Sequence, residues 1–271
     1  METYQIISLR AGKTAPLGPK GVRSSIAKTQ VNGLTIVTHS GLFGDEQGDT
    51  RRHGGAEKAI HHYPFDHYAK WQRELGELPL LHGPGAFGEN ISTLGLREDR
   101  VAVGDVFQFG SALIEVSQGR QPCWRLNDRF GRTTMSRETQ NTGRTGWYYR
   151  VLEPGFCEPY DRLILLDRRS PEWTISRIWN AFYIDSLNRS ELEGIVKLAA
   201  LTPTWREYAM RRLTTNQVED WSARLDGAPT PSPLYQIVSK AAVGTYPFKT
   251  GKCGNSLDTS SEPYAVVTPR R

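Results

Sequence analysis

Residues 106–127 read VFQFGSALIEVSQGRQPCWRLN, and the first half of this stretch predicts a β-hairpin. Two apolar-rich runs, VFQF and ALIEVS, flank Gly110-Ser111, a two-residue connection with glycine at its first position, as a type II′ turn requires. The second run leads within a few residues to Cys123. The sequence therefore predicts a sheet-rich fold with a cysteine just beyond the end of a strand.

Cys123 follows Pro122, which fixes the chain before it, and Arg120 and Arg125 stand on either side. Nearby cations lower the pKa of a thiol and favour the thiolate, which serves as a nucleophile or as a soft metal ligand. A buried structural cysteine is the alternative, and the residues alone do not decide between the two.

Short β-like runs broken by Gly, Pro, Asn and Asp continue to about residue 167, so this part is predicted to be mostly sheet. The clearest other runs are Tyr4–Leu9, Ile26–Val31, Ile91–Leu96 and Val101–Phe109. A second strand pair is predicted between Tyr148–Leu152 and Leu163–Leu166. One helix is expected around Pro64–Leu75, where aromatic residues recur near helical spacing.

After Arg169 the apolar residues recur with a helical period, which predicts three helices. The first is expected to have Ser170 as its N-cap and Pro171 at its first position. The second is expected to open with a capping box of Ser190 and Glu193, and the third at Thr202-Pro203. Short helices bury little alone, so these should pack on one another or on the sheet.

The expected fold is mainly β, of the α+β class, and the chain is divided into three parts. Residues 1–168 form the β-rich domain and residues 169–226 a small three-helix domain. Residues 227–271, rich in Pro, Ser, Thr and Gly, are predicted to be a flexible tail.

The composition, 38% hydrophobic and 23% charged in 271 residues, is ordinary for a soluble globular protein. No run approaches the roughly 20 apolar residues of a membrane span, and no signal peptide is evident, so we expect a cytoplasmic protein without a membrane partner. Three widely spaced cysteines with no C-x-x-C pair argue against a disulfide framework or an iron–sulfur cluster. The net charge of +5 favours an anionic partner.

A second unusual stretch, GLFGDEQGDTRRHGGAEKAIHHYP at residues 41–64, is rich in glycine and cationic residues. Glycine turns let backbone N–H groups approach an anion, so Arg51 and His53 are candidate contacts to a phosphate or pterin. A solvated loop is the alternative. Zinc is disfavoured, because the adjacent His61 and His62 should point to different sides of a strand or helix. Asp45-Glu46 is interpreted as a turn and surface pair.

Two other catalytic patterns are weak. GPGAFG at residues 83–88 matches a dinucleotide fingerprint in letters, but the following ENISTLGL predicts a strand rather than the helix that receives a pyrophosphate. No G-x-S-x-G elbow is present to place a hydrolase serine.

Eight ordered strings over roughly residues 20–226 resemble the MOSC family, the C-terminal domains of molybdenum cofactor sulfurases and their relatives. The closest branch is the YiiM-type group of N-hydroxylaminopurine resistance proteins, and the last three helices resemble the three-helix domain of that branch. The strings are S-x-I-A-K ending at Lys28, GLFGDEQ at 41–47, HGG at 53–55, HYP at 62–64, FGENIST at 87–93, VGDVF at 103–107, SQGRQPCWRLN at 117–127 and NTGRTGWYYRVLEPG at 141–155.

The resemblance implies a barrel-like fold that binds a molybdenum cofactor (molybdopterin), with Cys123 as the protein ligand to molybdenum. By the same matching, six further residues are implied to contact the pterin or its phosphate: Lys28, Gly88, Asn90, Arg120, Pro122 and Tyr149. The family's usual basic residue just ahead of the Asn90 motif is missing here, because Gly88 and Glu89 stand in its place.

The implied reaction is reduction of an N-hydroxylated compound, such as a hydroxylaminopurine base or an amidoxime, to the amine or amidine with release of water. The chain has neither a flavin motif nor cluster cysteines, so an external electron donor, a flavoprotein reductase, is the expected partner.

The sequence leaves two alternatives open. The domain could carry or mature the cofactor, although the absence of an attached aminotransferase-like domain counts against a self-contained sulfurase. Less favoured is a nucleic-acid-binding protein in which Arg206, Arg211 and Arg212 of the third helix meet phosphates. We expect no nucleic-acid partner, because that alternative leaves Cys123 and the glycine-rich stretch unexplained.

Overall fold

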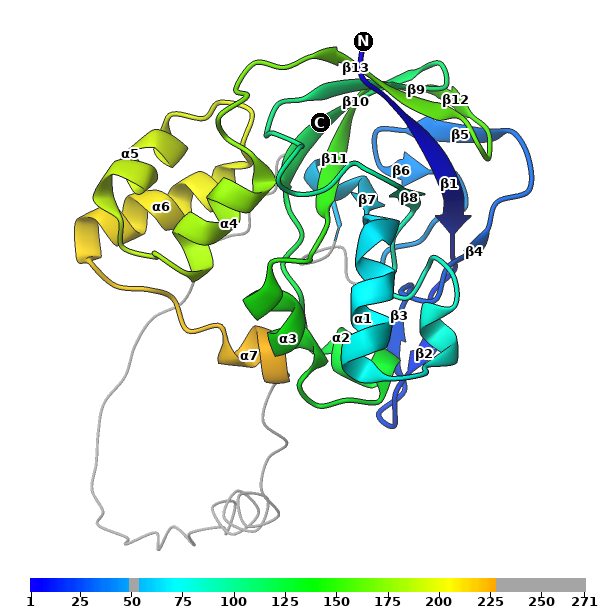
Figure 1. The fold of residues 1–271 in the computed structure, drawn as a ribbon, viewed down its shortest axis with the longest axis horizontal. Helices are drawn as coiled ribbons and strands as arrows, with labels where there is room; N and C mark the ends of the chain where they lie inside the picture. Colours follow the sequence, from blue (N-terminus) through cyan, green and yellow to red (C-terminus); the bar gives the residue numbers. More distant parts are fainter. Residues whose placement is uncertain (49–53, 228–271) are drawn as a thin grey trace, which may run out of the picture. The chain divides into compact units, whose positions relative to one another are not determined.

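The computed structural model describes residues 1–48 and 54–227, and within them seven strands close into a β-barrel (Figure 1). Around the barrel the strands follow the order β13, β9, β10, β11, β7, β8 and β1, and β1 pairs again with β13. An odd number of strands in a closed ring requires a parallel pair, and β7 and β8 provide it. The strands are β1 (Thr3–Ala11), β7 (Ile60–His62), β8 (Ile91–Thr93), β9 (Val106–Phe109), β10 (Ala112–Gly119), β11 (Trp147–Glu153) and β13 (Arg162–Asp167).

The predicted hairpin is confirmed, since β9 and β10 are antiparallel partners with Phe109 opposite Ala112. Gly110 has a φ of 60° and Ser111 is not among the described residues with positive φ, which matches a type II′ turn. A Cβ on Gly110 would lie 2.1 Å from the carbonyl oxygen of Phe156. The close approach of a neighbouring strand therefore restricts this position to glycine.

The second predicted pairing is wrong. Tyr148–Leu152 and Leu163–Leu166 are strands, but β11 pairs with β10 and β7, whereas β13 pairs with β9 and β1. Between them the chain first forms β12 (Gly155–Cys157), which pairs outside the barrel with β5 (Thr35–Thr38). It then forms β13, which pairs with β9, whereas β11 pairs with β10 on the other side of the hairpin. Three strands are shorter than predicted. Within residues 26–31 only β4 (Thr29–Gln30) forms. The strand predicted at residues 91–96 ends at Thr93, and the one predicted at residues 101–109 begins only at Val106.

The helix expected at Pro64–Leu75 is confirmed as a 3-10 turn, η2 (Phe65–His67), followed by α1 (Tyr68–Leu75). Two helices after Cys123 were not predicted, α2 (Arg125–Phe130) and α3 (Met135–Thr142). Each is short and ends at a glycine in the left-handed conformation. The remaining small elements are β2 (Ala15–Leu17), β3 (Val22–Ser24), β6 (Gly41–Leu42), η1 (Ala56–Lys58) and η3 (Pro79–Leu81).

The three helices expected after Arg169 are present as α4 (Ile175–Tyr183), α5 (Arg189–Val196) and α6 (Pro203–Thr215), and a short α7 (Ser222–Asp226) follows them. The start of α6 is as predicted, but the other two N-caps are wrong. Thr174 caps α4 by accepting a hydrogen bond from the Arg177 N–H at 3.2 Å, and Asn188 caps α5 by accepting from the Glu191 N–H at 3.3 Å. Ser170 instead starts a turn whose carbonyl accepts from Trp173, and Ser190 lies inside α5.

Helices α4, α5 and α6 lie together beside the barrel, next to β10 and β11 (Figure 1). A single buried apolar cluster joins the barrel strands to Trp179, Phe182 and Trp205 of these helices. A Cβ on Gly119, at the end of β10, would lie only 3.4 Å from Trp205. The expectation that the helices pack on the sheet is therefore confirmed, and each fully buried large side chain contributes roughly 1.5–3 kcal/mol.

The predicted tail, apart from Gly227, lies outside the described residues. None of the helices in the described ranges is both long enough and apolar enough to cross a membrane.

Candidate functional site

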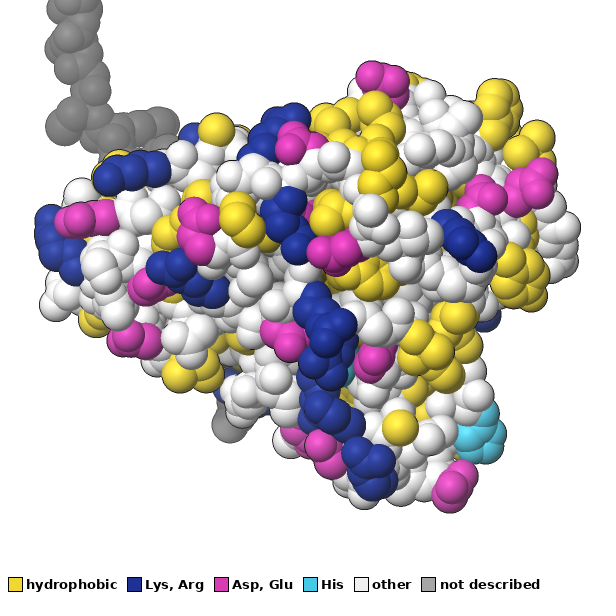
Figure 2. Space-filling model, turned by 45° about the horizontal axis from the view of Figure 1, so that its top comes forward, with side chains coloured by type: hydrophobic (Ala, Val, Ile, Leu, Met, Phe, Trp, Pro, Cys, Tyr) yellow, Lys and Arg dark blue, Asp and Glu magenta, His cyan; other side chains and the backbone are white. Residues whose placement is uncertain are grey.

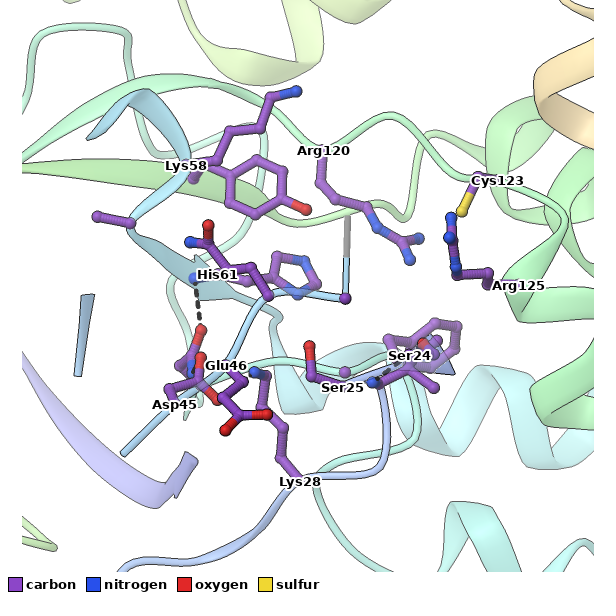
Figure 3. Close-up of a pocket in the computed structure, with 18 residues that line it drawn as sticks. Ser24, Ser25, Lys28, Asp45, Glu46, Lys58, His61, Arg120, Cys123 and Arg125 are labelled. Carbon is purple, nitrogen blue, oxygen red and sulfur yellow. Dashed lines mark hydrogen bonds and ion pairs between the residues drawn. The ribbon is translucent and has the colours of Figure 1, made fainter. Parts of the chain in front are cut away.

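A cavity open to solvent lies where β7 and β11 meet the segments around residues 24–28, 45–48 and 120–125 (Figure 3). Four basic residues line it against two acidic ones: Lys28, Lys58, Arg120 and Arg125 against Asp45 and Glu46. The cavity is therefore suited to an anionic ligand.

Cys123 lines this cavity, and Figure 3 shows its sulfur beside the side chains of Arg120 and Arg125. The residue is 5% exposed and is a thiol rather than half of a disulfide. It lies in the loop that joins β10 to α2, a position that matches the expected cysteine just past a strand. Cys157, the other described cysteine, is also buried but lies in β12 and does not line the cavity.

Arg120 supplies a charged group with unused hydrogen-bonding capacity. The residue is 5% exposed, its main-chain N–H donates to the Gly146 carbonyl at 3.0 Å, and Nη1 has no hydrogen-bond partner within the described residues. A buried donor without a partner costs free energy, more so on a charged group. An anionic oxygen in the cavity would satisfy it.

The register of β7 and β11 places His61 opposite Tyr148, with their ring centroids 5.1 Å apart on the cavity wall. Burial and the neighbouring Arg120 hold the pKa of His61 well below its usual value, so the imidazole is neutral at pH 7. Burial raises the pKa of Tyr148 against the opposing effect of Arg120, so its hydroxyl stays protonated. The wall beside Arg120 therefore offers neutral hydrogen-bonding groups.

On the other side of the cavity, Lys28, Asp45 and Asn90 form a hydrogen-bonded group. Lys28 Nζ lies 2.5 Å from Asp45 Oδ1, and both side chains are 7% exposed. Asn90 Nδ2 donates to Asp45 Oδ2 at 2.8 Å, and Asn90 Oδ1 accepts from the His61 N–H at 3.0 Å. The interpretation of Asp45 as a surface residue is wrong, because its carboxylate holds two cavity residues in place.

Gly88 and Glu89 have separate roles. Gly88 lines the cavity with a φ of 77°, and a Cβ there would lie 2.7 Å from Ile26. Glu89 is fully buried and accepts hydrogen bonds from Tyr68 and from the N–H groups of Gly85 and Phe87. Glu89 therefore stabilises the loop before β8, and of the two residues Gly88 is the one that lines the cavity.

The structure brings together five of the nine residues predicted for the site: Lys28, Gly88, Asn90, Arg120 and Cys123. Pro122 is buried and does not line the cavity. Tyr149 points into the barrel, where its hydroxyl lies 3.0 Å from His62 Nδ1. Arg51 and His53 lie outside the described residues.

Sequence reasoning missed Ser24, Ser25 and Tyr148, all of which line the cavity. The two serines belong to the S-x-I-A-K string, so that string carried a usable signal. Neighbouring residues of a strand face opposite sides, so either Tyr148 or Tyr149 could face the cavity. The pairing of β11 with β7 decides between them, and this pairing could not be read from the sequence.

Of the three basic residues proposed for nucleic-acid contact, Arg206 and Arg212 are engaged in the fold, whereas Arg211 is exposed. Arg212 is 1% exposed, with an ion pair to Glu219 at 2.7 Å and a hydrogen bond to the Phe182 carbonyl at 2.9 Å. Arg206 donates to the Leu201 carbonyl. Figure 2 shows one face on which basic side chains form a narrow band with acidic side chains beside it. The geometry of α6 gives the nucleic-acid alternative no support.

Two family models match the chain. The model described as MOSC domain matches residues 49–163, and the one described as YiiM-like, 3-alpha helix domain matches residues 173–216. Protein YiiM of Escherichia coli (strain K12) is 39% identical over 209 residues, which are 77% of this chain and 93% of that protein. A crystal structure of YiiM from Escherichia coli has a TM-score of 0.67 at 35% identity and covers 79% of this chain and 98% of its own.

A protein of Gibberella moniliformis (strain M3125 / FGSC 7600) named Reductase is 34% identical over 211 residues, which are 77% of this chain but 37% of that longer protein. The barrel, the cysteine-bearing cavity and these matches define a molybdenum-cofactor-type domain, and the chain belongs to the MOSC family. Within that family it is of the YiiM type, with the three-helix domain after the barrel, as the resemblance predicted.

Proposed function

We propose that this protein is a molybdenum-cofactor-dependent reductase of N-hydroxylated compounds, such as hydroxylaminopurine-type bases and amidoximes. The observation that carries the proposal is the buried Arg120, whose Nη1 has no hydrogen-bond partner in the described residues, next to the Cys123 thiol in a cavity with an excess of cations. Membership of the MOSC family supports the cofactor, and the relative named Reductase supports a redox role.

The residues present fit such a cofactor. Cys123 would be the thiolate ligand to molybdenum, and Arg120 would donate to an anionic oxygen of the bound group. Lys28 and Asn90, held by Asp45, would contact the pterin or its phosphate from the opposite side. Gly88 would let the backbone approach the ligand closely, since it carries no side chain.

When bound, the molybdenum cofactor would supply the two-electron redox chemistry. The net reaction consumes two electrons and two protons, breaks the N–O bond and releases water. The chain's own residues bind and orient the substrate. Tyr148 keeps its proton at Oη because burial raises its pKa, so it can donate a hydrogen bond to the substrate's hydroxyl oxygen.

Electrons would come from a separate flavoprotein reductase. The proposal therefore expects that the isolated protein reduces a hydroxylaminopurine with an artificial donor but not with NADPH alone. Full NADPH-driven turnover by the isolated protein would refute the need for a partner.

The central test is elemental analysis of the protein from a host that makes the cofactor, beside a Cys123→Ala variant and a Cys157→Ala variant. We expect molybdenum near one per chain in the wild type and in Cys157→Ala, and loss of metal and activity in Cys123→Ala. Cys157 is the matched control, because it is an equally buried thiol away from the cavity.

Each outcome has a distinct meaning. Metal without reductase activity would favour a cofactor carrier over an enzyme. No metal in the wild type from a competent host would contradict the cofactor assignment and leave Cys123 as a structural residue. Equal metal loss in both cysteine variants would point to a general effect on folding.

A further inference from the structure

The loop that carries Cys123 has no regular secondary structure between β10 and α2, so its main-chain groups need partners elsewhere. On one side the Arg120 N–H donates to the Gly146 carbonyl at 3.0 Å. On the other side the Trp124 N–H donates to the Arg224 carbonyl at 2.9 Å. The conformation of the loop therefore depends partly on α7, about a hundred residues further along the chain.

Arg224 of α7 contacts the residue immediately before the cysteine. Its Nη1 donates to the Pro122 carbonyl, and its Nη2 donates to Gln140 Oε1 of α3 at 2.6 Å. The guanidinium carbon lies 4.9 Å from the ring centroid of Trp221, which covers it from one side. One side chain thus joins the cysteine loop, α3 and α7.

Two further contacts hold this loop and the start of α2 to the C-terminal helices. Gln121 Nε2 donates to the Tyr183 hydroxyl of α4 at 2.6 Å. Asn127 Nδ2, just after the cysteine, donates to the Leu225 carbonyl of α7 at 3.0 Å. Both sides of Cys123 are therefore tied to elements outside the barrel, whereas the thiol itself lines the cavity.

We propose that Arg224 is a positioning residue for Cys123, which holds the loop through the Pro122 carbonyl so that the thiol faces the cavity. In this arrangement the C-terminal helices serve the site without lining it. Loss of the arginine lets the loop open locally, because a hydrogen bond from a charged group contributes more than a neutral one. The expected effect on molybdenum content rests on the proposed function, whereas the expected effect on the reactivity of the Cys123 thiol does not.

The first experiment uses the full chain without cofactor, made in a host that cannot synthesise it. Wild type, Arg224→Met and Arg224→Lys are labelled with iodoacetamide, and peptide mass spectrometry follows each cysteine. We expect Cys123 to react roughly tenfold faster in Arg224→Met, with Arg224→Lys close to the wild type, because lysine retains a charged donor. The rate at Cys157 should not change.

The matched control is Arg137→Met. Arg137 holds α7 through an ion pair with Asp226 at 2.5 Å, but both side chains are nearly half exposed and neither contacts the cysteine loop. Such a pair contributes little, so the Cys123 rate should stay near the wild-type rate. An equal increase in Arg137→Met, a parallel increase at Cys157, or an unchanged Cys123 rate in Arg224→Met would each overturn the proposal.

The second experiment measures molybdenum per chain in the same variants from a competent host. Arg224→Met should contain several-fold less metal than wild type, and Arg224→Lys should recover most of it. Full metal content in Arg224→Met would overturn the link between the loop and the metal. If the wild type itself contains no molybdenum, the proposed function fails, and the labelling rates still decide the role of Arg224.

Discussion

Two adjacent histidines of β7 show how single residues divide between the cavity and the barrel interior. His61 faces Tyr148 on the cavity wall, whereas His62 lies inside the barrel, 4.3 Å from Trp147 between ring centroids. Strand alternation produces this division, as expected for neighbouring residues in a strand. The interior histidine accepts or donates hydrogen bonds with Tyr149 and with Thr93 Oγ1, and its environment excludes water.

The interior position of His62 predicts a pH-dependent stability. Burial lowers the pKa of His62 from 6.5 to about 3, so below pH 6.5 the unfolded chain binds a proton that the folded chain does not. The contribution of His62 to the free energy of unfolding is therefore constant above this pH and falls as pH drops from 6.5 towards 3. One such group contributes a slope of at most about 1.4 kcal/mol per pH unit. His61 acts in the same direction, because burial and Arg120 lower its pKa.

Urea unfolding at pH 7 and pH 5 checks this prediction. In His62→Gln the loss of stability between the two pH values should be smaller than in the wild type by up to about 2 kcal/mol, because the titrating group is gone. His82→Gln is the control for removing an exposed imidazole, since the His82 side chain is 58% exposed. An unchanged slope in His62→Gln would contradict the assignment.

Loss of the Arg120 guanidinium should weaken retention of the cofactor. Arg120→Met keeps the apolar stem but removes the donor, so we expect roughly tenfold weaker retention of cofactor, measured as molybdenum and phosphate per chain after dialysis. The cofactor-free variant should be as stable as wild type or more so, because an unsatisfied buried donor is removed. Arg132→Met, an exposed arginine paired with Glu138 outside the cavity, should retain the cofactor fully.

The first residues of α4 and α6 show when local sequence determines where a helix starts and when a tertiary contact does. Thr202-Pro203 marks the start of α6 because proline at the first helical position needs no tertiary partner. Ser170-Pro171 carries the same local signal, yet the chain forms a turn there and α4 begins only after Thr174. Thr174 also bridges to Ala102, so a tertiary contact selects the later start.

The true cap of α4 can be identified by mutation. Thr174→Ala removes the acceptor for the Arg177 N–H and should lower the free energy of unfolding by about 1 kcal/mol. Ser170→Ala should change it by less than about 0.5 kcal/mol, as for a surface position. Chemical denaturation of both variants measures the difference, and a larger effect of Ser170→Ala would restore the cap suggested by the sequence.

Strand pairing was predicted correctly only where the partners adjoin in sequence. The β9–β10 hairpin is fixed by its own turn, so its residues suffice. The β7–β11 pairing joins residues more than eighty positions apart, and it places Tyr148 rather than Tyr149 in the cavity. The family motifs identified segments that line the cavity. They did not identify which side chains of those segments face it.

In the molecule as a whole, the barrel and the three helices share one apolar core. Trp205 of α6 is 1% exposed, and its ring centroid lies 4.8 Å from that of Phe182. It also packs close to Gly119, the residue of β10 from which the cysteine loop departs. The helices thus support the strand that leads to the site, and we propose that the barrel and helices α4, α5 and α6 unfold as one cooperative unit.

Trp205→Ala tests this coupling. The substitution should lower the free energy of unfolding by about 3–5 kcal/mol, because it leaves a large cavity where α6 meets the barrel. If the core is continuous, far-UV circular dichroism and tryptophan fluorescence should give coincident urea transitions in both wild type and variant. Met210→Ala, at a position of α6 that is 47% exposed, should change the stability by less than about 0.5 kcal/mol. Two separate transitions, with helical signal lost before the barrel unfolds, would show that the helices form an independent domain and would contradict the single cooperative unit.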